Sequence, residues 1–189
     1  IWKEFQKLGV EMDVVSSNDD LSDYKVVVAP MLYLLQSGTA ENLQKFVKNG
    51  GQLLATYFTG YVDKDTLCYL GGFPGDGLAE LFGVISEEID TLYPSDRNSL
   101  CFLDGKKWTV YDYAEILRVQ DAQILASYGT DFYEGSAALT VKEWESDTHT
   151  GENGRAYYIA ARVAPEEMGS LFETMLANAG IAVKDLPGE

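Results

Sequence analysis

The chain has 189 residues and a mass of 20.9 kDa, the size of one domain, and 46% of its residues are hydrophobic, enough to build a core. Its 30 acidic and 14 basic side chains give a formal net charge of -16, which would repel phosphate backbones and anionic membrane surfaces. We therefore expect neither a nucleic acid nor a membrane as a partner. No apolar run could span a bilayer and no segment resembles a signal peptide, so the sequence predicts a cytoplasmic location.

The first part of the chain carries a helical pattern. Apolar residues at helical spacing between Ile1 and Leu8 predict an amphipathic helix that Gly9 ends, and the alternation from Val10 to Val14 predicts a half-buried strand. A helix followed by a strand implies a preceding strand from which the helix crosses over. We therefore expect the chain to be a piece of a longer protein, with the first strand of this domain missing and its place near the sheet centre.

Residues 24–60 predict one complete strand, helix and strand unit. The apolar runs Val26 to Ala29 and Leu53 to Thr56 are typical of strands buried on both faces of a parallel sheet. Between them, the spacing of apolar residues from Leu43 to Val47 predicts a helix, and Gly50-Gly51 supplies its exit. A crossover of this length joins parallel strands. The unit therefore predicts an open α/β sheet covered by helices.

The second half of the chain has no long helix before its end. Short runs with strand character between residues 84 and 141 predict an antiparallel β section, and Ala137 to Trp144 and Ala156 to Ala161 predict a last pair of strands. Pro165 begins a final helix, which Gly180 ends. There are no repeats and no low-complexity linker, so we expect residues 1–189 to form a single domain.

Binding sites in open α/β sheets form beyond the carboxyl ends of the strands, which are here the loops 30–35 and 57–63. These loops are rich in aromatic residues. Exposed aromatic and methionine side chains in loops favour a protein interface or a wall that stacks on a sugar, although they can also cap the local core. The candidate substrate or interface residues are Met31, Tyr33, Tyr57, Phe58 and Asp63.

The chain offers little for catalysis, and we assign no catalytic residue. A nucleophile elbow needs a Ser or Cys on a tight, glycine-flanked turn after a buried strand, but bulky Tyr57 and Phe58 occupy that turn. The single histidine, His149, lies in a polar loop. One alternative stays open: an independent amidotransferase-like or esterase-like hydrolase that uses Thr59 or Cys68 with His149.

No metal or cofactor is expected, because the sequence lacks metal-ligand spacing, phosphate-binding glycine loops and dinucleotide fingerprints. The two cysteines, Cys68 and Cys101, are flanked by apolar residues. They predict buried free thiols, with a disulfide as the alternative.

Four phrases together resemble one family: YKVVVAPMLYLL, GGQLLATYFTGYVDKDTLCYLGGFPG, LFGVISEEIDTLYP and GRAYYIAARV. From about Trp2 to Leu176 the chain is similar to the trimerisation domain of family 42 glycoside hydrolases, the microbial β-galactosidases. The resemblance implies a flavodoxin-like or class I glutamine amidotransferase-like sheet with helices on both faces, and a homotrimer.

The same resemblance implies a non-catalytic oligomerisation domain that follows a catalytic barrel in one polypeptide. In that family, two glutamates of the barrel hydrolyse terminal β-D-galactosides with retention. A barrel needs roughly 250 residues, so no catalytic residue carries over to this chain. The aromatic loops are expected to face neighbouring subunits and to help wall the galactoside pocket. A galactoside-binding module is the remaining alternative.

Overall fold

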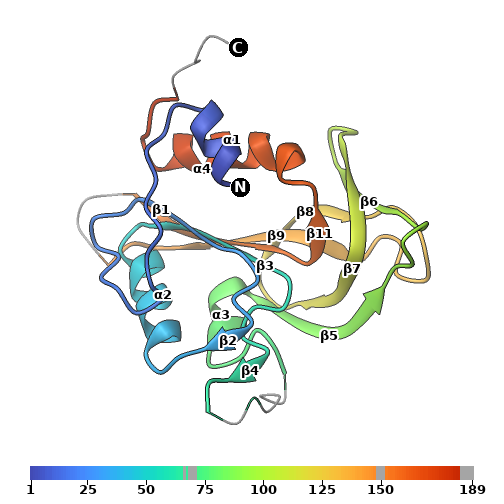
Figure 1. Ribbon diagram of the computed structural model, residues 1–189, viewed down its shortest axis with the longest axis horizontal. Coiled ribbons are helices and arrows are strands. Elements are labelled where there is room, and N and C mark those ends of the chain that lie inside the picture. Colours follow the sequence, from blue (N-terminus) through green and yellow to red (C-terminus); the bar gives the residue numbers. More distant parts are fainter. Residues whose placement is uncertain (66, 68–71, 148–151, 184–189) are drawn as a thin grey trace.

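A computed structural model of the chain describes residues 1–65, 67, 72–147 and 152–183, which form a nine-stranded mixed sheet, a separate two-stranded sheet and short helices (Figure 1). The helical segments are α1 (Trp2–Lys7), α2 (Thr39–Lys48), α3 (Leu78–Phe82), the 3-10 turn η1 (Pro165–Met168) and α4 (Gly169–Asn178). The strands are β1 (Val26–Ala29), β2 (Leu34–Leu35), β3 (Gln52–Thr56), β4 (Val62–Asp63), β5 (Val84–Thr91), β6 (Asn98–Phe102), β7 (Lys107–Val119), β8 (Gln123–Tyr128), β9 (Ala137–Trp144), β10 (Gly154–Ile159) and β11 (Ala161–Val163).

The large sheet has the order β1-β3-β10-β9-β8-β6-β7-β11, and β5 also pairs with β7. β3 is parallel to both β1 and β10, and every pairing beyond β10 is antiparallel. The separate pair β2 and β4 is also parallel. The sheet therefore has a parallel end, formed by β1, β3 and β10, and an antiparallel section, formed by the other strands.

The predicted fold class is wrong. A flavodoxin-like or class I glutamine amidotransferase-like parallel sheet with helices on both faces requires a crossover helix between successive strands. Here that connection occurs between β1 and β3, whereas the strands from β5 to β9 follow one another through turns such as Asp104-Gly105. Hairpin connections make neighbouring strands antiparallel. The helices consequently gather at the parallel end, as Figure 1 shows.

Several local predictions are confirmed. The strands at 26–29 and 53–56, the helix between them and the antiparallel strands of the second half lie where the patterns placed them. Gly83 and Gly180 end α3 and α4 with left-handed backbones. The strand expected from Val10 to Val14 is wrong, because residues 10–15 have no regular structure and Val14 is 89% exposed.

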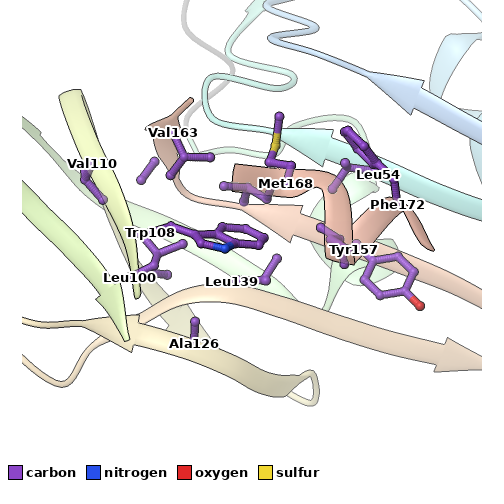
Figure 2. Close-up of a cluster of buried hydrophobic side chains, with 14 of the residues drawn as sticks. Leu54, Leu100, Trp108, Val110, Ala126, Leu139, Tyr157, Val163, Met168 and Phe172 are labelled. Atoms are coloured by element: carbon purple, nitrogen blue, oxygen red, sulfur yellow. The ribbon is translucent and has the colours of Figure 1, made fainter. Parts of the chain in front are cut away.

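The main core lies between α4 and the sheet. Phe172 of α4 is fully buried and stacks on Phe5 of α1, with 4.5 Å between the ring centroids. Figure 2 shows how the same cluster continues from the parallel end to Trp108 in the antiparallel section. One hydrophobic core therefore joins the two regions. On the opposite side, α2 and α3 pack a second cluster against the sheet.

Within the described residues, no helix is long and apolar enough to cross a membrane.

Candidate functional site

The turns that follow β1 and β3 are bound to each other at the carboxyl ends of these strands. The Met31 N–H donates a hydrogen bond of 2.7 Å to the Thr56 hydroxyl, and the Gly60 N–H donates one of 2.8 Å to the carbonyl oxygen of Leu32. The short parallel pair of β2 and β4 continues this contact. The two loops that the sequence singled out therefore form one ordered unit.

A third segment approaches the same unit at Gly60. The Gly75 N–H donates a hydrogen bond of 2.9 Å to the carbonyl oxygen of Gly60. Gly60 has a φ of 66°, and a Cβ added there would lie 2.7 Å from the Gly75 nitrogen. Both the left-handed backbone and the close approach require glycine at this position.

Five aromatic rings contact one another across this unit, and we call them the aromatic surface: Tyr33, Tyr57, Phe58, Tyr61 and Tyr113. Tyr33 stacks on Tyr61 with 5.4 Å between centroids. Tyr113, from β7, lies 5.2 Å from Phe58 and 6.0 Å from Tyr57. Tyr33 is 42% exposed and the other four rings are partly exposed, so the cluster reaches solvent.

The structure brings three of the five predicted site residues together, namely Tyr33, Tyr57 and Phe58. Met31 lies on the same turn with half of its surface exposed and a φ of 46°. Asp63 lies in β4, where its carboxylate accepts a hydrogen bond of 2.8 Å from the Asp65 N–H and closes the following turn.

Sequence reasoning missed two residues of β7, Tyr113 and Glu115. Tyr113 completes the aromatic surface, and Glu115 lies beneath it with no exposed surface. The available signal was an acidic residue inside the otherwise apolar run from Tyr113 to Leu117. A charged residue in such a run must be either exposed or partnered.

Glu115 is partnered by hydrogen-bond donors. The Phe58 N–H donates to its Oε1 at 2.5 Å, and the Tyr158 hydroxyl donates to its Oε2 at 2.8 Å. Burial raises the pKa of the Glu115 carboxyl to about 7, and these two donors oppose the rise because they stabilise the charged form. Burial, and then the nearby carboxylate, raise the pKa of the Tyr158 hydroxyl well above its ordinary value. The group is therefore a buried carboxyl that titrates near neutrality.

The turn above Glu115 shares one feature with a nucleophile elbow, a left-handed residue after a buried strand, but it leads to strand β4 rather than to a helix and lacks the chemistry. Phe58 has a φ of 62°, the left-handed conformation, but its phenyl ring cannot act as a nucleophile. The Thr59 side chain is fully buried, and its hydroxyl donates a hydrogen bond of 2.7 Å to the Thr56 carbonyl oxygen. The hydroxyl is therefore committed to the turn.

The other partners of the alternative hydrolase, Cys68 and His149, lie outside the described residues. Cys101 in β6 is a free cysteine, as predicted, but the prediction that it is buried is wrong, because it is partly exposed, with its sulfur 3.5 Å from the Ser99 hydroxyl. Among the residues that the structure describes, no three or more His, Cys, Asp or Glu side chains form a group that could hold a metal ion.

Comparison with known proteins decides the family. A sequence model of the β-galactosidase trimerisation domain matches residues 2–182. The chain belongs to this family. The resemblance that we drew from four sequence phrases is thereby confirmed, and the chain is a trimerisation domain rather than the catalytic part of such an enzyme.

Curated relatives agree with the assignment. The chain is 40% identical to β-galactosidase BglY of Alicyclobacillus acidocaldarius over 182 residues, which are 93% of this chain and 25% of that protein. It is 39% identical to β-galactosidase Pbg of Clostridium perfringens over 180 residues, 92% of this chain and 25% of that protein. This trimerisation domain thus spans about a quarter of the length of these relatives.

Solved structures show the same fold. Gan42B, a GH42 β-galactosidase from G. stearothermophilus, superimposes with a TM-score of 0.85 at 34% identity, covering 96% of this chain and 25% of that one. The β-galactosidase from Rahnella sp. R3 gives a TM-score of 0.86 at 32% identity, covering 98% and 28%. The mixed sheet of this trimerisation domain is therefore the fold that these enzymes contain.

Proposed function

We propose that the chain is the assembly domain of a β-galactosidase and joins identical subunits into a homotrimer. In this proposal residues 1–189 act as one domain, and a catalytic barrel elsewhere in the same polypeptide hydrolyses terminal β-D-galactosides. The observation that supports it most directly is the family match over residues 2–182. The cytoplasmic location predicted from the sequence belongs to the same proposal.

The aromatic surface is the part of the domain best suited to contact a neighbouring subunit. Copies that each carry a formal charge of -16 repel one another, and uncharged rings at the contact do not add to this repulsion. Tyrosine and phenylalanine rings provide large, rigid contact areas that are enriched at interfaces. A tyrosine hydroxyl is uncharged at neutral pH, and burial raises the pKa of the Tyr57 hydroxyl further.

The same surface also fits the second role expected from the sequence, a contribution to the wall of the galactoside pocket. Tyr33 and Tyr57 are at least partly exposed, and a tyrosine combines an apolar ring face with a hydroxyl, which suits the mixed apolar and polar surface of a sugar. Met31, half-exposed on the same turn, would extend the wall. Asp63 is proposed only for the edge of this region, because its carboxylate is engaged with Asp65.

Light scattering over a concentration series of the 189-residue chain tests assembly. We expect the mass of a trimer, and at least about tenfold weaker association when Tyr33→Ala and Tyr57→Ala are combined, because the double variant removes two anchor rings. The control is Tyr93→Ala, which removes a tyrosine that is 76% exposed on the loop after β5. An unchanged trimer in the double variant would exclude the aromatic surface as the subunit contact.

Assays on the same samples separate the alternatives. We expect no β-galactosidase activity from this chain, because the proposal places catalysis in the barrel. Hydrolytic activity that disappears in His149→Ala would instead support an independent hydrolase. Titration with galactose addresses the third possibility: saturable binding by a chain that stays monomeric would favour a galactoside-binding module over an assembly domain.

A further inference from the structure

Glu115, near the middle of β7, is a fully buried carboxyl. The ion pairs among the described residues all use other carboxylates, and the Glu115 carboxyl instead accepts hydrogen bonds from uncharged donors, the Phe58 N–H and the Tyr158 hydroxyl, with the Ser86 hydroxyl also acting on it. Its main chain is also fixed: its N–H donates to the Ala160 carbonyl oxygen at 2.7 Å, and its carbonyl oxygen accepts from the Tyr128 hydroxyl at 3.0 Å. The carboxyl is therefore held in a rigid frame.

The rigid Glu115 carboxyl holds the turn at Phe58 in place. A bulky residue with a φ of 62° is in a conformation that L-residues adopt only at a cost. The hydrogen bond from its N–H to Glu115 offsets part of that cost. Tyr113 lies two residues before Glu115 on β7, so both side chains share one side of the strand, and the Tyr113 ring contacts the Phe58 ring. β7 thus contacts Phe58 at two points: the Glu115 side chain accepts the hydrogen bond from the Phe58 N–H, and the Tyr113 ring contacts the Phe58 ring.

We propose that Glu115 is a positioning residue that keeps the Phe58 turn, and with it the aromatic surface, in the observed conformation, and that ionisation of its carboxyl favours opening of the turn. The hold on the turn does not depend on assembly. Its consequence for trimer formation rests on the proposed function.

None of the described groups that act on the carboxyl is a cation that could offset its ionisation in the buried site. Tyr158 of β10 and Tyr128 of β8 are buried hydroxyls whose pKa values are raised, so neither carries charge near neutrality. Ser86 of β5 and Tyr57 of the turn are also uncharged neighbours. The cation that acts on Tyr57 is Arg162, which is already paired with an aspartate, Asp112. On β5, Asp90 accepts the Tyr133 hydroxyl.

The direction of the pH effect follows from burial. Desolvation is the largest influence on Glu115 and raises its pKa from the ordinary 4.5 to about 7 in the closed turn. Opening the turn would hydrate the carboxyl and return its pKa toward the ordinary value. The closed turn therefore binds the proton more tightly, and its stability is complete below about pH 4.5, falls as the pH rises, and becomes constant above about pH 7.

Hydrogen exchange of the Phe58 amide between pH 5 and 8 tests the proposal in the 189-residue chain. After correction for intrinsic exchange, we expect protection to fall by up to about tenfold per pH unit and to level off above about pH 7. Glu115→Gln keeps an acceptor for the Phe58 N–H but cannot ionise, so its protection should not vary with pH. The control, Glu88→Gln, removes an exposed carboxylate of the adjacent strand β5 and should keep the original profile.

A second variant guards against failure of Glu115→Gln to fold. Tyr158→Phe removes a donor that stabilises the ionised carboxyl and so raises the pKa of Glu115. Protection of the Phe58 amide should then level off at a higher pH than in the original chain. Protection that does not depend on pH in the original chain overturns the proposal, as does a slope that persists in Glu115→Gln.

Light scattering of the same samples at pH 5.5 and pH 8 separates this proposal from the proposed function. A trimer that weakens with rising pH in the original chain, but not in Glu115→Gln, supports both. If the Phe58 amide shows the expected profile while the mass stays constant, the role of Glu115 stands and the aromatic surface is not the subunit contact. If the amide shows no pH dependence, the role of Glu115 is excluded whatever the mass.

Discussion

The parallel end and the antiparallel section of the sheet bury their strands in different ways. In the parallel end, every residue of β3 is buried. Helices pack against the strands on both sides of the sheet, where they form the two core clusters. In the antiparallel section, hairpins replace the helices, and buried residues alternate with more exposed ones along parts of strands such as β7. The parallel end therefore depends on helix packing, whereas the antiparallel section depends on pairing between neighbouring strands.

The candidate site lies where these two regions meet. The turns of the parallel end supply Tyr33, Tyr57 and Phe58, and the long strand β7 supplies Tyr113 and Glu115. β7 pairs with β5, β6 and β11, so it is fixed from several sides before it reaches the turn. A rigid strand from one region thus sets the conformation of a strained turn in the other.

The largest expected effect tests whether the two regions share one core. Phe172→Ala should lower the free energy of unfolding by about 3–5 kcal/mol, because it leaves a cavity beside Phe5 and the sheet. Urea denaturation measures the change, and Glu173→Ala, exposed on the same helix, should change it by less than about 0.5 kcal/mol. Separate unfolding transitions for the two regions would contradict a shared core.

The second-largest effect on stability is expected from the Glu115 carboxyl, which lies where the two regions meet. Because the folded pKa of Glu115 is about 7 against an ordinary 4.5, its contribution to stability is complete below about pH 4.5 and is lost as the pH rises to about 7. The loss is on the order of 3 kcal/mol. Urea denaturation at pH 5, 6, 7 and 8 should show this component in the original chain and not in Glu115→Gln. Equal pH profiles for both proteins would exclude it.

A pair of glycines compares the turns of the two regions directly. Gly60→Ala should cost roughly 2–3 kcal/mol, since its backbone is left-handed and a Cβ would lie 2.7 Å from the Gly75 nitrogen. Gly105→Ala, in the hairpin between β6 and β7, has a φ of 87° but nothing within 4 Å of the added Cβ. It should cost about 1 kcal/mol, from backbone strain alone. Equal costs in thermal denaturation would show that the packing around Gly60 is loose.

The smallest effect is expected for an ion pair on the surface of the antiparallel section. Arg118 and Glu87 are about half-exposed, at 54% and 51%, and bridge β7 and β5. Solvent screens such a pair, so Arg118→Ala should cost less than about 1 kcal/mol in urea denaturation. A larger loss, insensitive to added salt, would mean that the side chain stabilises the strand pair through packing.

The sequence by itself determined the local elements and the family. Apolar runs and helical spacing placed β1, α2, β3 and α4, and turn residues placed the hairpins of the antiparallel section. These signals are local, because the period of apolar residues and the backbone needs of glycine are set within a few positions. The phrases shared with the trimerisation domain also gave the family, which the match over residues 2–182 confirms.

Only the tertiary structure decided how the strands are directed and where the site lies. The direction of each strand depends on how its connection crosses the sheet, and a helix at residues 39–48 does not determine the hairpins that follow. The bond between Phe58 and Glu115 joins residues 57 positions apart. No periodicity marks such a pair, because its energy comes from burial and hydrogen bonding that exist only after the two regions have packed together.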